Sequence, residues 1–310
     1  MNGLHLIKNA KRGTMMTLMN ALKMTVAATL IALPVAATQA QAQDSGAFAA
    51  AMGATKGFDN LPKTWKFKSL VKDGVLTIGT TGAAPPRTFV DPATSKLTGS
   101  YVDLFTKIGT DLGLKVKFVQ IEWAGILPGL AANRFDLACD GASWTPERLS
   151  SDQFFLTSPT AVNATVALTR KDTGIKTFAD AKTAELGGVR GENYFEGAKK
   201  ALPDAPATEF PGFQESLIGL QNDQVKLVAM NLSNALNVLA TAPNKGDLVM
   251  VTPALQVYPQ GLCVNPKEPD LLVAVNALLG NYRADGSLKA LVGKYGDSTD
   301  EVDLLKTIGY

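Results

Sequence analysis

Residues 135–148 read FDLACDGASWTPER. The apolar start of this stretch predicts a buried strand, and the Gly and Ser residues after it predict a short loop. A helix then begins with Thr145 as its N-cap and Pro146 in its first position. This order places the Ser143 hydroxyl, the Arg148 guanidinium and free backbone N–H groups at the carboxyl end of a strand, where open α/β sheets bind small ligands. A guanidinium beside a hydroxyl suits a carboxylate, although a capped surface helix with a solvated arginine has the same pattern.

The first 42 residues predict a cleaved signal peptide. A basic start precedes the apolar run Met24–Ala37, and Ala40-Gln41-Ala42 supplies the small residues that signal peptidase requires. A retained membrane anchor is the alternative, but the apolar run is short for a span. We therefore expect residues 1–42 to be removed on export to the periplasm, and residues 43–64, rich in Ala and Gly, to form a flexible leader.

Export would also change the charge of the chain and remove its one histidine. Four of the 30 Lys and Arg residues and none of the 28 Asp and Glu residues lie in residues 1–42, so the remaining chain is slightly acidic. Nothing in that balance indicates a nucleic-acid partner. The histidine, His5, lies in the same segment, so a mature chain has none for a Ser–His or Cys–His pair or a zinc site. These features disfavour hydrolases and zinc enzymes, and we expect neither a metal nor another cofactor.

The chain has two cysteines, Cys139 and Cys263, and both lie in apolar segments. In an exported protein such a pair makes a disulfide possible. Two buried free thiols are the alternative.

Strand-like and helix-like segments alternate along the chain. The expected strands are 75–79, 115–120, 137–139, 165–169, 186–189, 225–230, 248–251 and 261–264, and the expected helices are 101–112, 125–133, 194–201, 215–222, 232–240, 270–282 and 287–295. Short loops between them indicate an α/β fold with mostly parallel sheets flanked by helices. Because the alternation restarts near residue 165, we expect two lobes with a cleft between them.

Several motifs follow one another in a characteristic order. They are LTIGT (76–80), GSYVDL (99–104), ILPGL (126–130), SWTPER (143–148) and DGSL (285–288). Over about residues 70–296 the chain resembles the bacterial extracellular solute-binding proteins of family 3, the periplasmic receptors of polar amino-acid ABC importers.

The resemblance implies a two-lobed, type II-like periplasmic binding protein with two hinge crossings, near residues 168–172 and 257–262. Lobe 1 would contain residues 65–169 and 261–310, and lobe 2 residues 170–260. A ligand would close the cleft by contacting both lobes. The closed form, which we expect to be a monomer, would then dock on an ABC permease in the inner membrane.

By position in the motifs, the resemblance implies that Arg148 holds the carboxylate of the ligand, with Ser143 and Gly141 beside it. In lobe 2, Glu192 and Asn193 follow Gly191 in the turn before a helix, where relatives bind the same carboxylate through backbone amides.

At three positions the chain departs from the family pattern. Thr81 and Asn231 stand where the family commonly has an Asp, and Ala84 stands where it has an aromatic residue. An Asn cannot neutralise an ammonium group, which weakens the case for an ordinary α-amino acid. Asp140 and Glu192 are the carboxylates that could substitute, although an acid is also favourable at a helix N-terminus without any ligand.

Four larger side chains have two interpretations each. Arg87 and Arg190 flank the expected cleft and either meet a second anionic group of the ligand or are solvated. Trp144 is the preferred apolar wall of the cleft and Trp123 the second choice, although a tryptophan after a strand is as often a core residue.

Together these features predict a periplasmic substrate-binding protein of an ABC importer that takes a small carboxylate-bearing solute, a polar amino acid or a relative, and is not an enzyme. The alternative is a cofactor-free, dehydratase-like enzyme on the same scaffold, which would need only a cleft acid such as Glu192 or Asp140.

Overall fold

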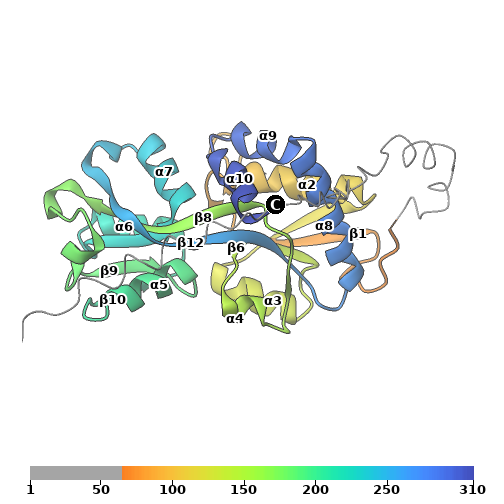
Figure 1. The fold of residues 1–310 in the computed structure, drawn as a ribbon, viewed down its shortest axis with the longest axis horizontal. Coiled ribbons are helices and arrows are strands. Elements are labelled where there is room, and N and C mark those ends of the chain that lie inside the picture. The colour runs from red at the N-terminus through yellow and green to blue at the C-terminus, as the bar shows by residue number, and fades with distance from the viewer. Residues whose placement is uncertain (1–64) are drawn as a thin grey trace, which may run out of the picture. The chain divides into compact units, whose positions relative to one another are not determined.

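The computed structural model describes residues 65–310 (Figure 1). The predicted signal peptide and leader, residues 1–64, lie outside the described residues. From Trp65 onward, no helix combines the length and the apolar character that crossing a membrane requires.

Nine strands form one large sheet. They are β1 (Val75–Thr80), β5 (Lys115–Gln120), β6 (Leu137–Ser143), β7 (Phe155–Leu156), β8 (Ala161–Arg170), β9 (Leu186–Val189), β10 (Ala207–Phe210), β11 (Leu227–Asn231) and β12 (Leu248–Val264). Their order is β10-β9-β11-β8-β12-β6-β1-β5, with β7 beside β12. A second, small sheet contains β2 (Ala83–Ala84), β3 (Thr88–Val90) and β4 (Leu97–Thr98).

Helices cover the sheet in two groups. The first group is α2 (Ser100–Asp111), α3 (Ile126–Ala131), α4 (Pro146–Leu149), α8 (Pro269–Ala284), α9 (Ser287–Lys294) and α10 (Asp300–Asp303), and the second is α5 (Asn193–Ala201), α6 (Phe213–Gln221) and α7 (Leu232–Thr241). Single turns of 3-10 helix are η2 (Trp123–Gly125), η3 (Lys171–Thr173), η4 (Phe178–Ala181), η5 (Lys245–Asp247) and η6 (Leu304–Ile308).

These elements form two lobes, as the alternating pattern predicts. In lobe 1, β1 pairs in parallel with β5 and β6, and in lobe 2, β9 pairs in parallel with β10 and β11. Each lobe has apolar cores of its own, because the buried clusters beneath α2 and α8 and around α3 share no buried residue with those beneath α5, α6 and α7. A mixed α/β fold with mostly parallel pairing within each lobe is therefore confirmed.

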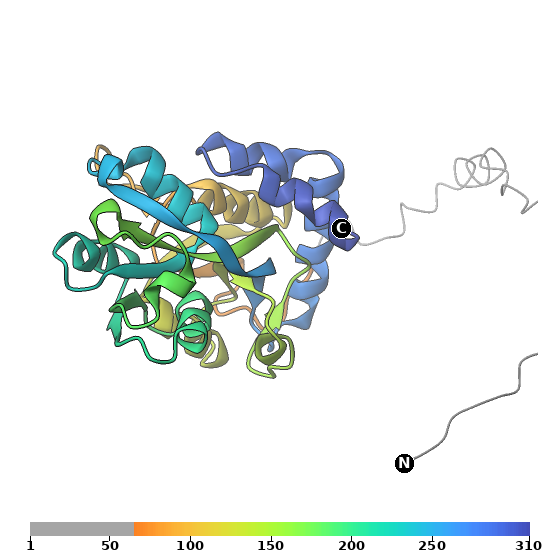
Figure 2. The ribbon, with the colours of Figure 1, turned by 60° about the vertical axis from the view of Figure 1, so that its left-hand side comes forward.

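Two antiparallel strands, β8 and β12, join the lobes. β12 pairs with β8 from Leu248 to Gln260 and with β6 from Gln260 to Val264, so one long strand runs through both lobes (Figure 2). Residues Thr165–Thr169 of β8 pair with β11 of lobe 2. The boundaries assigned to the lobes at residues 169–170 and 260–261 stay a prediction.

Helix α2 shows how the sequence dictates an element. Its buried Tyr101, Leu104, Phe105 and Ile108 recur every three or four residues and place one face of the helix in the lobe 1 core. The helix then ends before Gly113, which has a φ of +71°, the left-handed conformation in which glycine commonly terminates helices.

Several strands are longer than the sequence predicts, and two of them show the reason. The expected strand at 137–139 continues to Ser143, because backbone pairing with β12 keeps the Gly/Ser segment extended. The two strands expected at 248–251 and 261–264 are one strand, because pairing with β8 extends through the weakly apolar residues between them. Both errors arise from long-range pairing, which local composition does not report.

Cys139 and Cys263 form a disulfide, with their Cα atoms 5.6 Å apart. The bond joins β6 to β12 in the lobe 1 core, where both residues are buried. The alternative of two free thiols does not apply to this structure.

Candidate functional site: a cleft between the two lobes

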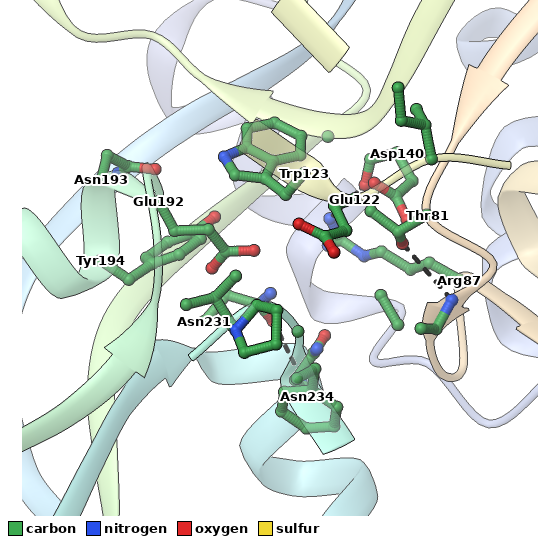
Figure 3. Close-up of a pocket in the computed structure, with 18 of the residues that line it drawn as sticks. Thr81, Arg87, Glu122, Trp123, Asp140, Glu192, Asn193, Tyr194, Asn231 and Asn234 are labelled. Atoms are coloured by element: carbon green, nitrogen blue, oxygen red, sulfur yellow. Dashed lines mark hydrogen bonds between the residues drawn. The ribbon is translucent and has the colours of Figure 1, made fainter. Parts of the chain in front are cut away.

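A cleft of about 230 Å³ lies between the lobes (Figure 3). Its walls follow the carboxyl ends of β1 and β6 in lobe 1 and of β9 and β11 in lobe 2, the edge at which parallel sheets bind ligands. Most of the residues singled out from the sequence line it: Thr81, Ala84, Arg87, Asp140, Gly141, Arg148, Glu192, Asn193 and Asn231. Their roles toward a ligand stay predictions.

Arg148 reaches this cleft from the short helix α4. Thr145 caps the helix by accepting a hydrogen bond from the Arg148 backbone N–H at 3.3 Å, with Pro146 in the first position as expected. The Arg148 Nη1 donates to Asn193 Oδ1 across the cleft at 3.3 Å and to the Ser143 carbonyl at 3.4 Å. No carboxylate within the described part of the chain lies within 4.0 Å of its guanidinium.

Arg148 is therefore not the freely solvated arginine of the alternative interpretation. It is half-buried, with its guanidinium carbon 5.5 Å from the centre of the Trp123 ring, and burial lowers its pKa. An arginine side chain remains protonated in spite of such a shift. The result is a charged fork in a partly desolvated cleft, with protein hydrogen bonds only to neutral oxygens.

Glu192 faces Arg148 from lobe 2. It is the N-cap residue of α5, but its side chain makes no capping hydrogen bond. Burial first, and then the charge of Asp140, raise the pKa of Glu192 to about 7, while Arg148 acts in the opposite direction. The carboxyl group therefore titrates near neutral pH.

Asn231 performs a structural role at the start of α7. Its Oδ1 accepts a hydrogen bond from the Asn234 backbone N–H at 2.8 Å, which makes it the N-cap of the helix. Asn234 lines the same cleft, and Figure 3 shows its amide group directed into it. The Asn234 Oδ1 is buried and accepts no hydrogen bond from the described residues.

The structure corrects the solvated interpretation of Arg87, whose exposure is only 2%. Its Nε lies 3.3 Å from Asp297 and its Nη2 lies 2.5 Å from Glu301, both in the C-terminal segment. Nη1 donates to Gln260 Oε1 and to the Asp140 carbonyl, and Nη2 also donates to the Ser233 hydroxyl of lobe 2. The guanidinium is thus occupied by protein partners. Arg190, by contrast, is exposed and pairs with Glu122 at 3.0 Å.

Gly141 brings the backbone close to that guanidinium. Its φ is +109°, and a Cβ at this position would lie 2.4 Å from Arg87 Nη1. A side chain here would displace Arg87, which explains the glycine.

Two predicted residues do not line the cleft. The Ser143 hydroxyl is buried and donates to the Tyr194 hydroxyl at 3.2 Å. Ser143 therefore contacts Tyr194, which lines the cleft, without lining the cleft itself. Trp144, the preferred apolar wall, instead packs edge-on against Tyr310, with ring centres 6.0 Å apart. The backbone of this segment pairs with β12, since Ser143 lies opposite Gln260 and the Trp144 N–H donates to the Pro259 carbonyl. This long-range pairing, which the local sequence does not report, sets the direction of both side chains.

The second-choice tryptophan forms the wall. Trp123 lines the cleft under Arg148, and its Nε1 donates to the Gly191 carbonyl at 3.1 Å, from lobe 1 to lobe 2. The position of Trp123 after the strand at 115–120 placed it near the correct edge, but only the tertiary structure separates it from Trp144.

Several lining residues were missed in the sequence. They are Glu122, Tyr194, Phe213, Glu215 and Asn234. Tyr194 comes one residue after the predicted Asn193, and Asn234 comes three residues after the predicted Asn231, each at a helix start. That position in the sequence is a signal that could have found them. Phe213 and Glu215 come from the start of α6, for which the sequence offered no comparable motif.

The described part of the chain contains no group of three or more His, Cys, Asp or Glu side chains placed to hold a metal ion. The cleft offers instead a guanidinium, carboxylates, amides and an indole. Groups of these kinds are suited to a small polar solute, through hydrogen bonds and charge.

Comparison with known proteins agrees with this arrangement. The L-cystine-binding protein TcyA of Bacillus subtilis is 29% identical over 240 residues, which cover 76% of this chain and 87% of that protein. A probable amino-acid ABC transporter-binding protein of Haemophilus influenzae is 30% identical over 226 residues, 71% of this chain and 84% of that protein.

Solved structures and a family model agree with these sequence relatives. The crystal structure of the ancestral amino acid-binding protein AncCDT-1, a precursor of cyclohexadienyl dehydratase, is 27% identical with a TM-score of 0.65, over 72% of this chain and 95% of that one. The model of the bacterial extracellular solute-binding proteins, family 3, matches residues 76–298. The match spans both lobes and the cleft, and the chain belongs to this family of solute-binding proteins.

Proposed function

We propose that this protein binds an amino acid, or a closely related carboxylate-bearing solute, in the cleft and delivers it to an ABC permease. The carboxylate of the solute binds Arg148. The protein acts as a monomer in the periplasm, after removal of residues 1–42, and performs no chemistry on its ligand.

The state of Arg148 supports this proposal most directly. Its charged fork is half-buried, rests on Trp123, and has neutral oxygens but no carboxylate as partners. A partly desolvated cation gains most from an anionic partner that forms two parallel hydrogen bonds. The names of the relatives, a cystine-binding protein and an amino-acid ABC transporter-binding protein, agree with such a partner.

The test combines a ligand screen with a substitution. We expect the melting temperature to rise with particular amino acids, because a ligand that binds only the folded state stabilises it. Arg148→Ala should weaken that binding at least ~30-fold, since it removes a charged partner from a desolvated pair. Calorimetric titration of the purified mature chain measures the affinity.

Arg134→Ala is the matched control, because Arg134 is exposed and lies over Phe135 outside the cleft. It should leave the affinity unchanged. A folded protein that responds to no amino acid or organic acid would contradict the receptor function. Unchanged affinity of Arg148→Ala would remove Arg148 from the site.

A dehydratase on this scaffold is the second candidate, since Glu192, with a pKa raised to about 7, would suit a general acid. The fold neighbour related to such an enzyme is itself described as an amino acid-binding protein. Incubation with prephenate, followed by chromatography, separates the two functions because a receptor leaves its ligand unchanged.

A further inference from the structure

The carboxylates around the cleft differ in whether the protein neutralises them. Glu122 pairs with Arg190 at the rim, and Glu215, in the first turn of α6, is exposed to solvent. Asp140 and Glu192 also line the cleft. Neither has a Lys or Arg nitrogen of the described chain within 4.0 Å.

Asp140 and Glu192 come from opposite lobes and act on each other. Asp140 lies in β6, where its Oδ2 accepts a hydrogen bond from Thr88 Oγ1 at 2.5 Å. Glu192 lies at the start of α5, and Figure 3 shows its carboxylate directed into the cleft. The charge of Asp140 is one of the causes that raise the pKa of Glu192, so the two groups repel across the cleft. Two like charges in a partly desolvated space favour a cation between them.

The cations already present do not fill that role. Arg87 is occupied by Asp297 and Glu301, and no nitrogen of the Arg148 guanidinium lies within 4.0 Å of the Asp140 or Glu192 carboxylate.

 Arg148 therefore forms no ion pair with Asp140 or Glu192, and it is reserved for the carboxylate of the solute. Neither carboxylate therefore has an ion-pair partner in the described part of the protein, although the charge of Arg148 acts on Glu192 from beyond that distance.

A further acceptor points to the same kind of ligand. Asn234 lines the cleft and is 4% exposed, and its buried Oδ1 has no hydrogen-bond donor among the described residues. A buried acceptor without a partner costs free energy unless a ligand or water donates to it. Asn231 is neutral, and its Oδ1 already caps α7. Asp140, Glu192 and Asn234 therefore offer acceptor oxygens to a ligand in the cleft.

We propose that Asp140 and Glu192, one from each lobe, form the subsite that binds a cationic nitrogen of the solute, in place of Asn231. The inference rests on the proposed function, in which Arg148 holds the carboxylate. The solute is then at least a zwitterion rather than a simple organic acid. A zwitterion neutralises Arg148 and one of the two carboxylates, and a basic amino acid neutralises both, so basic amino acids should bind most tightly among related solutes.

The experiment compares matched ligands on matched variants. The mature chain is titrated calorimetrically with the twenty standard amino acids and L-cystine, and each amino acid that binds is paired with its deaminated carboxylate. Glu192→Gln should weaken binding of the amino acid at least ~10-fold, because a hydrogen bond to a charged group is lost. It should leave binding of the deaminated partner unchanged.

Two further variants keep the test decisive. Asp140→Asn retains an oxygen that can accept the hydrogen bond from Thr88, and it should also weaken binding of the amino acid but not of the deaminated carboxylate. This variant tests the subsite even if Glu192→Gln fails to fold. Glu196→Gln makes the same change on the same helix outside the cleft, where Glu196 pairs with Lys199, and should have no effect.

The outcomes separate this inference from the proposed function. Deaminated carboxylates that bind the wild type as tightly as their parent amino acids would overturn the cation subsite and leave the carboxylate receptor standing. The cation subsite would also be overturned if Glu192→Gln weakened binding of an amino acid and of its deaminated carboxylate by the same factor. Failure of all these ligands to bind would overturn the proposed function itself.

Discussion

Glu192 derives its chemistry from its surroundings rather than from its type. At a helix start in solvent, a glutamate is an ordinary acid that the helix dipole favours. Here burial in the cleft and the charge of Asp140 raise its pKa to about 7, although Arg148 favours the ionised form. The sequence allows Glu192 to be either a ligand-binding residue or an ordinary acid at a helix start. In the ligand-free structure its surroundings disfavour the ionised form of its carboxyl group.

This shift predicts a pH dependence of stability. Since the pKa of Glu192 is higher in the folded state than in the unfolded state, the folded state binds its proton more tightly. The contribution of Glu192 to the free energy of unfolding therefore falls as the pH rises from below its ordinary pKa to above 7. Glu192→Gln removes this loss, so it should raise the melting temperature of the ligand-free protein more at pH 8 than at pH 5.

Thermal unfolding at both pH values measures the effect, with Glu196→Gln as the control on the same helix outside the cleft. An equal change at pH 5 and pH 8 would contradict the raised pKa. The groups that face Glu192 and can also titrate or carry charge are Asp140, Arg148 and Tyr194.

At the scale of the element, helix starts position much of the cleft. Helices α4, α5 and α7 begin at its edge, after Thr145, Glu192 and Asn231. Thr145 and Asn231 cap their helices with side-chain oxygens, whereas Glu192 does not. This difference separates a residue that holds the fold from one that is free for a ligand.

Asn231→Ala should therefore reduce stability rather than selectivity. Loss of an N-cap costs about 1 kcal/mol of the free energy of unfolding. The preference for an amino acid over its deaminated carboxylate should not change, because Asn231 does not belong to the cation subsite. Urea unfolding and calorimetric titration measure the two quantities.

Asn231→Ser is the matched control, because serine caps helices about as well as asparagine. It should retain the stability of the wild type. A selective loss of amino-acid binding in both variants would return the ammonium role to Asn231.

At the scale of the whole molecule, Arg87 connects parts of the chain that are far apart in sequence. Its guanidinium contacts Asp297 and Glu301 of the C-terminal segment, Gln260 of β12 and Ser233 of lobe 2. Ser233 and Asn163 also bond to Glu301, so the network includes the strand β8. It lies where both lobes and both crossing strands meet.

Arg87→Ala should destabilise the protein by about 3–5 kcal/mol, because it leaves buried carboxylates without their cation. Adding Glu301→Gln removes one of those charges and should recover part of the loss. Urea unfolding of the two single variants and the double variant gives the coupling. Strictly additive effects would show that Arg87 and Glu301 do not stabilise each other.

Local sequence determined much of the fold. The strands at 115–120 and 186–189 have the predicted bounds, and Thr145 and Pro146 begin α4 as expected. These features depend on neighbouring residues, through apolar periodicity and capping, so the sequence reports them directly. The order of the motifs then predicted two lobes and placed Arg148 at the cleft.

Only the tertiary structure decided which side chains meet there. It buries Arg87 against Asp297 and Glu301, turns Trp144 away in favour of Trp123, and brings Asp140 and Glu192 together from different lobes. Each of these outcomes depends on pairing and packing between residues distant in the chain, above all on β8 and β12. A local pattern carries no information about such contacts, because their free energy exists only once the two lobes are assembled.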